Sequence, residues 1–278
     1  VAGRMAVDGE QNAMSENQAA PPATGQRPRS PVRRTIVDSV ERVTPLLRRI
    51  MLTGEELAGF GPPRPASHIK LHMVPQGTVW SPTDETAPRP PRRTYTPRSF
   101  DPVRLRLEVE FVLHGHGLAA RWAEQATPGQ EIFVSGPGGG YDVPVDATSI
   151  VLLADDTALP AAGMILESLP AGCDVTVVAE IAGRDEQRPL SARLPCSAMW
   201  LHRDETNARG GTLLEQAVHA LASKADDALW WIACEASAMR RIRQHLIQVR
   251  GVAPARLHTR GYWKLGETAY PDHDYGKE

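Results

Sequence analysis

The pattern of hydrophobic positions divides the chain into two parts with different periods. From Arg33 to about Asp146, short β-branched or alternating runs are separated by proline and glycine, as in antiparallel strands. These runs are 35–43, 46–52, 68–74, 92–95, 105–113 and 131–134, with one short helix at 119–125. They predict a six-stranded antiparallel β-barrel in which Pro97 ends the fourth strand. The proline-rich segment 75–91 is expected to be a long surface loop.

After Asp146, apolar runs typical of buried strands alternate with helical patterns. The runs 149–154, 174–180, 199–202 and 229–234 predict strands, and 158–169, 213–221 and a segment capped by Ser237 predict helices. Strands that alternate with helices favour a parallel α/β sheet. We therefore expect two domains, 32–146 and 147–278. A parallel α/β sheet of the kind expected in 147–278 binds dinucleotides at the carboxyl ends of its strands.

Residues 1–31 lack aromatic side chains and are rich in polar residues, proline and glycine, which predicts a disordered tail. The rest of the 278-residue chain has no apolar run near the roughly 20 residues of a membrane span, and its start has no apolar leader. We therefore expect a cytoplasmic protein.

Charge and cysteine content narrow the function classes further. The net charge of −2 provides no global positive field for nucleic acid or an anionic membrane. Three cysteines without a CxxC pair argue against a disulfide framework, a zinc site or an iron–sulfur site. Redox chemistry would therefore need a bound organic cofactor.

The segment RTYTPR at 93–98 combines three kinds of chemistry on one strand. Arg93 and Tyr95 share a face of an extended strand, where a guanidinium can bind phosphate and an aromatic ring can stack on a flat heterocycle. The hydroxyl of Thr96 can hydrogen-bond a ring nitrogen. The same pattern also fits a strand with a solvated arginine and a core tyrosine.

Two glycine-rich turns follow. HGHGLA at 114–119 enters a helix, whose first backbone N–H groups can bind pyrophosphate. His114 and His116 could ligate a metal, but no third ligand lies nearby, so we expect no metal site. GPGGGY at 136–141 fits a flexible turn where the domains join.

Polar residues also follow the first two strands of the second part. Asp155, Asp156 and Thr157 stand where dinucleotides bind, although both acids also suit helix N-caps. The usual GxGxxG fingerprint is missing. Arg184 and Arg188 could meet the 2′-phosphate of NADPH or simply be solvated.

Taken in order and spacing, six motifs resemble the siderophore-interacting proteins, FAD-dependent ferric-siderophore reductases of the ferredoxin-reductase-like superfamily. The resemblance covers roughly residues 33–267. The motifs are RTYTPR at 93–98, HGHGLAARWA at 114–123, SGPGGGY at 135–141, LLADDTALPAAGMILE at 152–167, ACEASAMRRIRQHL at 233–246 and GYWKLGE at 261–267.

The resemblance implies roles in binding FAD. Arg93 would contact the pyrophosphate, Tyr95 would stack on the isoalloxazine, and Thr96 would hydrogen-bond near N5. The positions that would cradle the pyrophosphate are His114, Gly117 and Ala119.

The resemblance also implies which residues bind the nicotinamide dinucleotide and which bind the ferric siderophore. Glu235 would lie near flavin and nicotinamide and act with Tyr95 and Thr96 in catalysis, while Lys70 and Lys264 would attract the ferric siderophore. The residues expected at the nicotinamide dinucleotide are Asp155, Asp156, Thr157 and Ala158. Gly138 stands where many relatives have arginine, so one positive charge near the substrate is missing.

The expected function is reduction of siderophore-bound Fe(III) to Fe(II) through FAD, with electrons from NAD(P)H or from a reduced ferredoxin. The siderophore brings the iron, so the protein itself needs no metal ligands. We expect a monomer without nucleic-acid or membrane partners. Two alternatives remain open: a general NAD(P)H-flavin or ferredoxin-type oxidoreductase, and a non-catalytic protein that binds siderophore or flavin.

Overall fold

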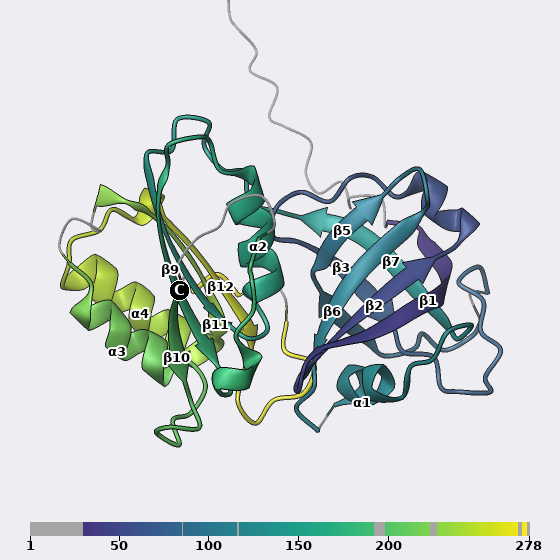
Figure 1. Cartoon of the computed structure of the whole chain (residues 1–278). Helices are drawn as coiled ribbons and strands as arrows, with labels where there is room; N and C mark the ends of the chain where they lie inside the picture. Colours follow the sequence, from purple (N-terminus) through teal and green to yellow (C-terminus); the bar gives the residue numbers. More distant parts are fainter. Residues whose placement is uncertain are drawn as a thin grey trace, which may run out of the picture.

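Two β-sheets lie side by side in the computed structural model, one antiparallel and one parallel (Figure 1). The structure describes residues 30–84, 86–115, 117–191, 198–222, 227–271 and 274–276. Most of the tail predicted at 1–31 and the side chain of His116 lie outside these residues. No helix in the described part of the chain is long and apolar enough to span a membrane.

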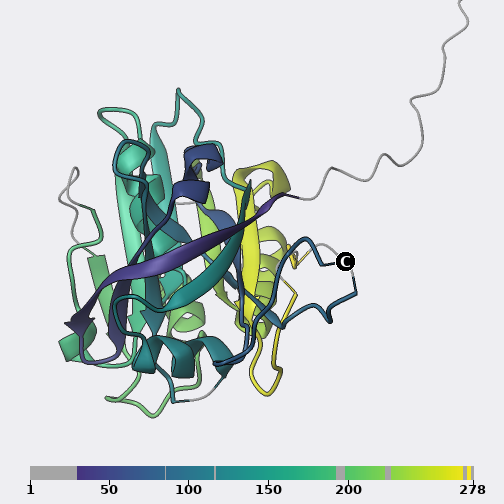
Figure 2. The ribbon, with the colours of Figure 1, turned by 90° about the vertical axis from the view of Figure 1, so that its right-hand side faces the viewer.

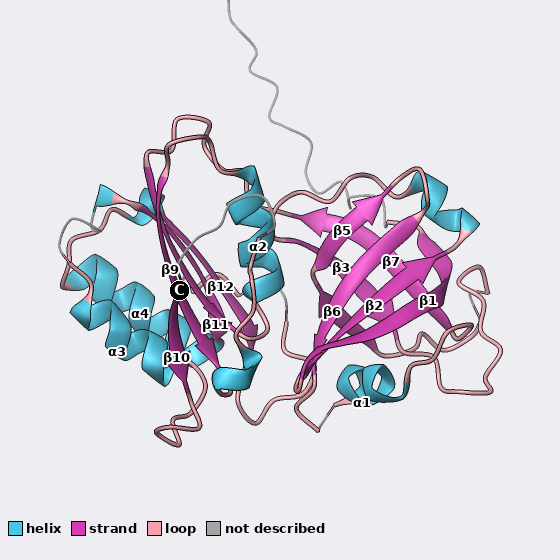
Figure 3. Ribbon diagram, viewed as in Figure 1, coloured by secondary structure: helices cyan, strands magenta, loops and turns pink. Residues whose placement is uncertain are grey.

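The first sheet has seven strands in the order β4-β3-β7-β1-β2-β6-β5. They are β1 (Val32–Thr44), β2 (Leu47–Thr53), β3 (Ser67–His72), β4 (Arg92–Tyr95), β5 (Pro97–Asp101), β6 (Arg106–Val112) and β7 (Glu131–Gly139). The 3-10 helix η1 (Glu55–Gly59) follows β2, and the helix α1 (Leu118–Gln125) packs beside the sheet (Figure 3). The inner side chains, among them Ile50, Leu71 and Phe111, are fully buried and form one core.

The antiparallel barrel is confirmed, but its predicted count of six strands is wrong. The missed strand is β5, which pairs antiparallel with β6 from Pro97 opposite Val109. Proline lacks an N–H donor, and it is tolerated here because Pro97 is the first residue of a strand at the edge of the sheet order. β4 and β5 are the two ends of that order, and Thr96 joins them. Pro97 therefore starts a strand instead of ending the pairing.

The second sheet has the order β10-β9-β8-β11-β12, with every pair parallel. Its strands are β8 (Ser149–Asp155), β9 (Asp174–Ile181), β10 (Ala198–His202), β11 (Leu229–Glu235) and β12 (Leu257–Trp263). The helices are α2 (Leu159–Ser168), α3 (Thr212–Ala220) and α4 (Ala236–Gln248), with the 3-10 turns η2 (Arg184–Glu186) and η4 (Pro254–Arg256). The α/β expectation is confirmed, and β12 is a strand that the hydrophobic pattern did not predict.

Helices cover both faces of the parallel sheet. Helix α2 lies on the side of the barrel, and α3 and α4 lie on the opposite face (Figures 1 and 3). The strand order reverses between β8 and β11, which is the place where open α/β sheets bind ligands.

Hydrogen bonds and ion pairs connect the two domains. Arg98 of β5 forms a two-point pair with Glu167 of α2, at 3.0 and 2.6 Å. The carboxylate of Glu186 accepts hydrogen bonds from the backbone N–H of Leu46, at 2.9 Å, and from the hydroxyl of Thr44. Figure 2, turned by 90°, shows the barrel in front of the α/β domain. The change of sheet falls between Gly139 and Ser149, and the domain boundary at 146/147 stays a prediction.

Candidate functional site

The strand β4 and the helix α1 are linked through a row of aromatic rings. Arg93 and Tyr95 are half-buried on one face of β4, where they pair with Leu71 and Ile69 of β3. The ring centroid of Tyr95 lies 4.5 Å from that of Phe111, which in turn lies 5.5 Å from that of Trp122 in α1. Burial raises the pKa of Tyr95, so its phenol stays neutral. Tyr95 is thus connected by packing to the helix that the glycine turn enters.

The start of α1 fits a pyrophosphate group. Gly117 precedes the helix with φ 85°, and no side chain caps it. The first N–H groups of a helix have no partner within the helix. A Cβ at Gly115 would meet nothing within 4 Å, and one at Gly117 would meet only the His114 ring, at 3.5 Å. Backbone donors that are open in this way can receive an anion. Ala119 is buried one residue into the helix, so only its backbone can take part.

The edge strand β12 packs against the barrel. Tyr262 forms a hydrogen bond with the side chain of Thr96, which is 8 % exposed. Arg260 lies two residues earlier, and its Nη2 is 3.4 Å from Nδ1 of His68 in β3. The junction between β4 and β5 is therefore buried under the second domain. The sequence analysis assigned no role to His68, Arg260 or Tyr262, although Tyr262 lies within the motif GYWKLGE. Three consecutive polar residues, at 258–260, gave no strand pattern.

Of the two lysines expected at the substrate, one lies on β3 and the other directly follows β12. Nζ of Lys70, on β3, donates a hydrogen bond to Oγ1 of Thr94, at 2.7 Å. Lys264 directly follows β12 and forms an ion pair with Glu267, at 2.5 Å. The space beside Gly138 is taken by His68, whose Nε2 is 3.4 Å from the position that a Cβ would occupy.

Asp155 and Thr157 form a closed turn at the end of β8. Oδ1 of Asp155 accepts hydrogen bonds from the backbone N–H and the hydroxyl of Thr157, at 3.0 and 2.6 Å. Its Oδ2 accepts one from Nε1 of Trp263, at 2.7 Å. Burial raises the pKa of Asp155, and these hydrogen bonds oppose that rise. The carboxylate thus ties the end of β8 to the end of β12. Ala158 follows with no exposed surface.

Asp156 belongs to a buried chain of charges. Arg203 pairs with Asp156 through Nη2 and with Glu180 through Nη1, the latter at 3.4 Å. The Glu180 side chain is fully buried and accepts three backbone N–H groups at the start of α3, at 2.7, 3.0 and 3.2 Å. The carboxyl ends of β8, β9 and β10 are held together by this chain. Burial raises the pKa of Asp156 in spite of Arg203.

Glu235 occupies the end of β11, on the other side of the switch point. Its Oε2 accepts the N–H of Ala238, at 2.8 Å, and so caps α4. Its Oε1 accepts the N–H of Leu265, at 3.3 Å, next to Lys264. Asp155 and Glu235 therefore both hold the loop that carries Lys264.

The two arginines considered for a 2′-phosphate lie in different surroundings. The Arg184 side chain is 76 % exposed and lies 3.6 Å from Glu205. The Arg188 side chain is only 8 % exposed and faces Glu110 of the barrel. Arg188 is therefore not solvated, and the charge of Asp156 also acts on it. Among the described residues, no group of three or more His, Cys, Asp or Glu side chains could hold a metal ion.

The barrel with its open helix start, followed by a parallel sheet with a switch point, defines a two-domain flavin- and nicotinamide-binding reductase fold. Two family models match the chain: the siderophore-interacting FAD-binding domain over residues 36–141 and the siderophore-interacting protein over 147–266. The chain belongs to the siderophore-interacting protein family.

Curated relatives support this assignment. The chain is 32% identical to an NADPH-dependent ferric-chelate reductase of Escherichia coli, over 81% of this chain and 89% of the relative. It is 28% identical to a ferric vibriobactin reductase of Vibrio cholerae, over 82% and 88% of the two chains.

Solved structures agree in fold. A siderophore utilization protein from T. fusca superposes with a TM-score of 0.76 and 34% identity, covering 87% of this chain and 96% of that one. The siderophore-interacting protein SipS from Aeromonas hydrophila gives a TM-score of 0.72 and 28% identity, with 86% and 94% covered. A phthalate dioxygenase reductase, at 15% identity and a TM-score of 0.57 over 82% of this chain and 67% of that one, shares the fold.

Proposed function

We propose that this protein is an FAD-dependent ferric-siderophore reductase that takes its electrons from NADPH. The proposal rests on two features that lie together. One is the uncapped start of α1 near the strand that carries Arg93 and Tyr95, and the other is the switch-point edge of the parallel sheet, where dinucleotides bind and which packs on the same barrel. The names of the relatives in E. coli and V. cholerae agree with it.

Bound FAD would supply an acceptor for a hydride pair that can release electrons singly, which suits Fe(III). The residues of the chain hold and orient it. Arg93 and the first turn of α1, with His114, Gly117 and Ala119, would bind the pyrophosphate, and Tyr95 would stack on the flavin. Thr96, which is buried beneath β12 and hydrogen-bonded to Tyr262, would lie near N5.

The nicotinamide dinucleotide would lie over the switch point. Asp155, Asp156, Thr157 and Ala158 would shape the turn at the end of β8, and Glu235 would fix the end of β11. Because the carboxylates of Asp155 and Glu235 already accept hydrogen bonds from the protein, we assign both to positioning of these turns.

A ferric siderophore would approach between β3 and the end of β12. Lys70 and Lys264 would supply the positive charge that attracts an anionic chelate. Siderophores bind Fe(III) through hard oxygen ligands, and Fe(II) fits those ligands less well, so reduction releases the iron. We further propose that the protein works as a monomer in the cytoplasm, and that reduced ferredoxin is the alternative donor.

The test begins with the visible spectrum of the purified protein before and after anaerobic addition of NADPH. Flavin bands that bleach, followed by NADPH-dependent trapping of Fe(II) by a chelator when a ferric siderophore is added, are the expected result. Flavin bands that persist would instead favour ferredoxin or a binding role, and a protein that cannot take up FAD would overturn the proposal.

A variant separates the flavin site from the rest. Arg93→Ala should retain at most a tenth of the FAD after gel filtration, whereas Arg104→Ala, an exposed arginine on the same barrel, should keep the full amount. Full retention by Arg93→Ala would contradict the assigned role of Arg93.

A further inference from the structure

Thr96 lies at the junction of the two domains. It joins β4 to β5 and is only 8 % exposed. Its hydroxyl forms a hydrogen bond with the phenol of Tyr262, on β12 of the α/β domain. Thr96 is also one of the residues assigned to the flavin. A single buried hydroxyl therefore connects the flavin side of the barrel to a side chain of the other domain.

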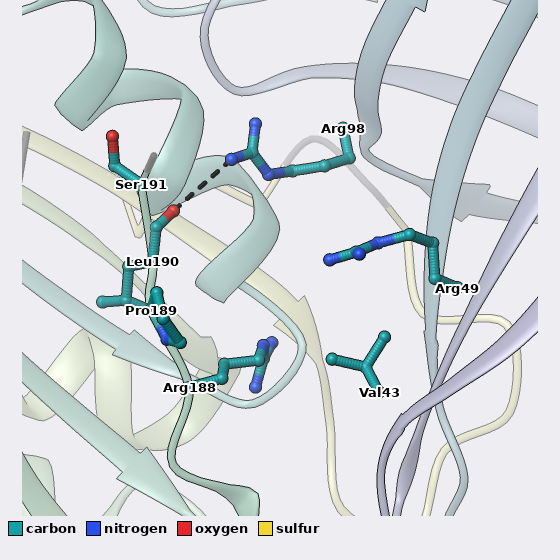
Figure 4. A pocket seen from close by; sticks show the side chains of 7 residues that line it. All are labelled: Val43, Arg49, Arg98, Arg188, Pro189, Leu190 and Ser191. Carbon is teal, nitrogen blue, oxygen red and sulfur yellow. Dashed lines mark hydrogen bonds between the residues drawn. The ribbon is translucent and has the colours of Figure 1, made fainter. Parts of the chain in front are cut away.

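The docking of the domains holds this junction in place. Arg98, two residues after Thr96, crosses to the α/β domain, where it pairs with Glu167 at 3.0 and 2.6 Å. It also donates a hydrogen bond to the carbonyl oxygen of Leu190, at 3.4 Å. Figure 4 shows this arginine reaching across the pocket that both domains line. The segment that carries Thr96 is thus tied to the domain that carries Tyr262.

Tyr262 is held by its own domain. Its ring meets the ring of the buried Trp231 edge-on, with the centroids 6.5 Å apart. The guanidinium of Arg260 lies 5.9 Å from the centroid of the same ring, which is a cation–π distance. Arg260 also reaches the barrel, where its Nη2 is 3.4 Å from Nδ1 of His68. The packing of the α/β domain therefore directs the phenol toward Thr96.

The phenol stays neutral and keeps its hydrogen. Burial raises the pKa of Tyr262, although the charge of Arg260 and the hydrogen bond with Thr96 oppose that rise. A neutral phenol and a threonine hydroxyl each have one hydrogen to donate and lone pairs that accept. The hydrogen bond between Tyr262 and Thr96 can therefore run in either direction.

The group assigned to the other side of Thr96 changes its hydrogen-bonding role, and this part of the argument rests on the proposed function. In an oxidised flavin N5 accepts a hydrogen bond. A hydride from NADPH, which leaves as NADP+, turns N5 into an N–H donor. When N5 donates to the hydroxyl of Thr96, the hydrogen of that buried hydroxyl needs an acceptor of its own. The phenol oxygen of Tyr262 is such an acceptor.

We propose that Tyr262 is a positioning residue for flavin reduction. While Thr96 donates to N5, the phenol donates to Thr96, and once N5 donates, Thr96 donates to the phenol. No proton passes between the two side chains, because only the direction of their hydrogen bond reverses. The α/β domain thereby stabilises the reduced flavin through Thr96.

The test uses the FAD-loaded variant Tyr262→Phe, which loses the phenol oxygen and keeps the ring. We expect full FAD content, an unchanged half-saturating concentration of NADPH and about tenfold slower flavin reduction in anaerobic stopped flow. The hydroxyl hydrogen of Thr96 loses its acceptor only beside the reduced flavin, so the midpoint potential should fall. A tenfold loss in the equilibrium constant corresponds to about 30 mV for this two-electron couple. Tyr270→Phe is the matched control and should behave as the parent, because the Tyr270 hydroxyl donates to Asp274 instead, at 2.6 Å.

A second variant shows whether Tyr262 acts through Thr96. Thr96→Val removes the hydroxyl, and adding Tyr262→Phe to it should lower the midpoint potential no further. Thr96→Ser keeps a hydroxyl and should reduce its flavin within twofold of the parent rate. A parent-like potential for Tyr262→Phe, or an equal fall in both backgrounds, would overturn the proposal.

The remaining outcomes are also decisive. If Tyr262→Phe does not fold, Thr96→Val alone decides: a lowered potential supports the proposal and a parent-like one overturns it. Parent protein that takes up no FAD would contradict the proposed function, and this role of Tyr262 with it. Parent protein with normal flavin reduction and unaffected variants would contradict the role of Tyr262 alone.

Discussion

Glu180 offers the sharpest quantitative prediction, because its carboxylate has no exposed surface and accepts hydrogen bonds from the backbone N–H groups of Gly211, Leu213 and Leu214. Glu180→Gln replaces one oxygen with an NH2 group and removes the charge. The variant keeps the shape of the side chain, but its NH2 group cannot accept a hydrogen bond, so at least one backbone N–H loses its acceptor and the ion pair with Arg203 is lost.

The magnitude follows from these contacts. A hydrogen bond to a charged group contributes about 1.5–3 kcal/mol and one between neutral groups about 0.5–1.5 kcal/mol, so the two bonds that the amide oxygen can keep lose about 2 kcal/mol together. A buried backbone N–H left without an acceptor costs about 1–3 kcal/mol more. The lost charge at the start of α3 adds about 0.5–1 kcal/mol through the helix dipole. We expect the free energy of unfolding to fall by about 4 kcal/mol, a large share of the 5–15 kcal/mol typical of folded proteins.

Urea denaturation at pH 7 measures this loss, with fluorescence from the buried Trp230 and Trp231 reporting on the α/β domain. Glu56→Gln is the matched control, since Glu56 accepts one backbone N–H, that of Arg34 at 2.7 Å, at an exposed position. The control should lose less than about 1 kcal/mol. A loss below about 1 kcal/mol for Glu180→Gln as well would refute the reasoning.

Three further predictions concern other parts of the molecule. Burial lowers the pKa of His72 to about 4. As the pH falls from about 6.5 to 4, the unfolded chain therefore binds a proton that the folded chain does not bind, and up to about 3 kcal/mol of stability is lost. His72→Gln should flatten this fall in urea denaturation between pH 7 and 4.5, and an unchanged slope would contradict it. Trp263→Phe removes the donor to Asp155, so the free energy of unfolding should fall by about 1–3 kcal/mol. The KM for NADPH should rise while the FAD content stays constant, and an unchanged KM would argue against a role for this turn. Glu186→Gln weakens the contact with Leu46 and should separate the thermal unfolding of the two domains in calorimetry, where we expect one transition for the parent protein; a single transition in the variant as well would contradict this.

Local patterns in the sequence were sufficient for most of the fold. The strands of both sheets follow from their hydrophobic periods, and the change of period after Asp146 separates the two architectures. The two missed strands have a common reason. Pro97 and the polar residues of β12 look unfavourable locally, and only the position at a sheet edge and the contact with another domain make them strands. Such tertiary contacts are not visible in a short window of sequence.

The candidate site shows the same division. Arg93, Tyr95 and the glycine turn could be predicted as site residues because each lies within one short motif. His68 and Arg260 could not, since their contact joins positions 192 residues apart. The buried state of Arg188 likewise depends on the docking of the domains, whereas the sequence around it looks like an ordinary polar loop.

The last described residues also protect the protein against aggregation. β12 is an edge strand, and an open edge is a template for pairing with another chain. The segment 274–276 runs along this edge, where the N–H of Gly261 donates to the carbonyl oxygen of Asp274, at 2.9 Å, and the hydroxyl of Thr259 donates to that of Tyr275, at 2.6 Å. Arg240 of α4 anchors the segment through an ion pair with Asp274, at 3.0 Å. The edge strand β12 is thereby kept from pairing with a second copy of the sheet.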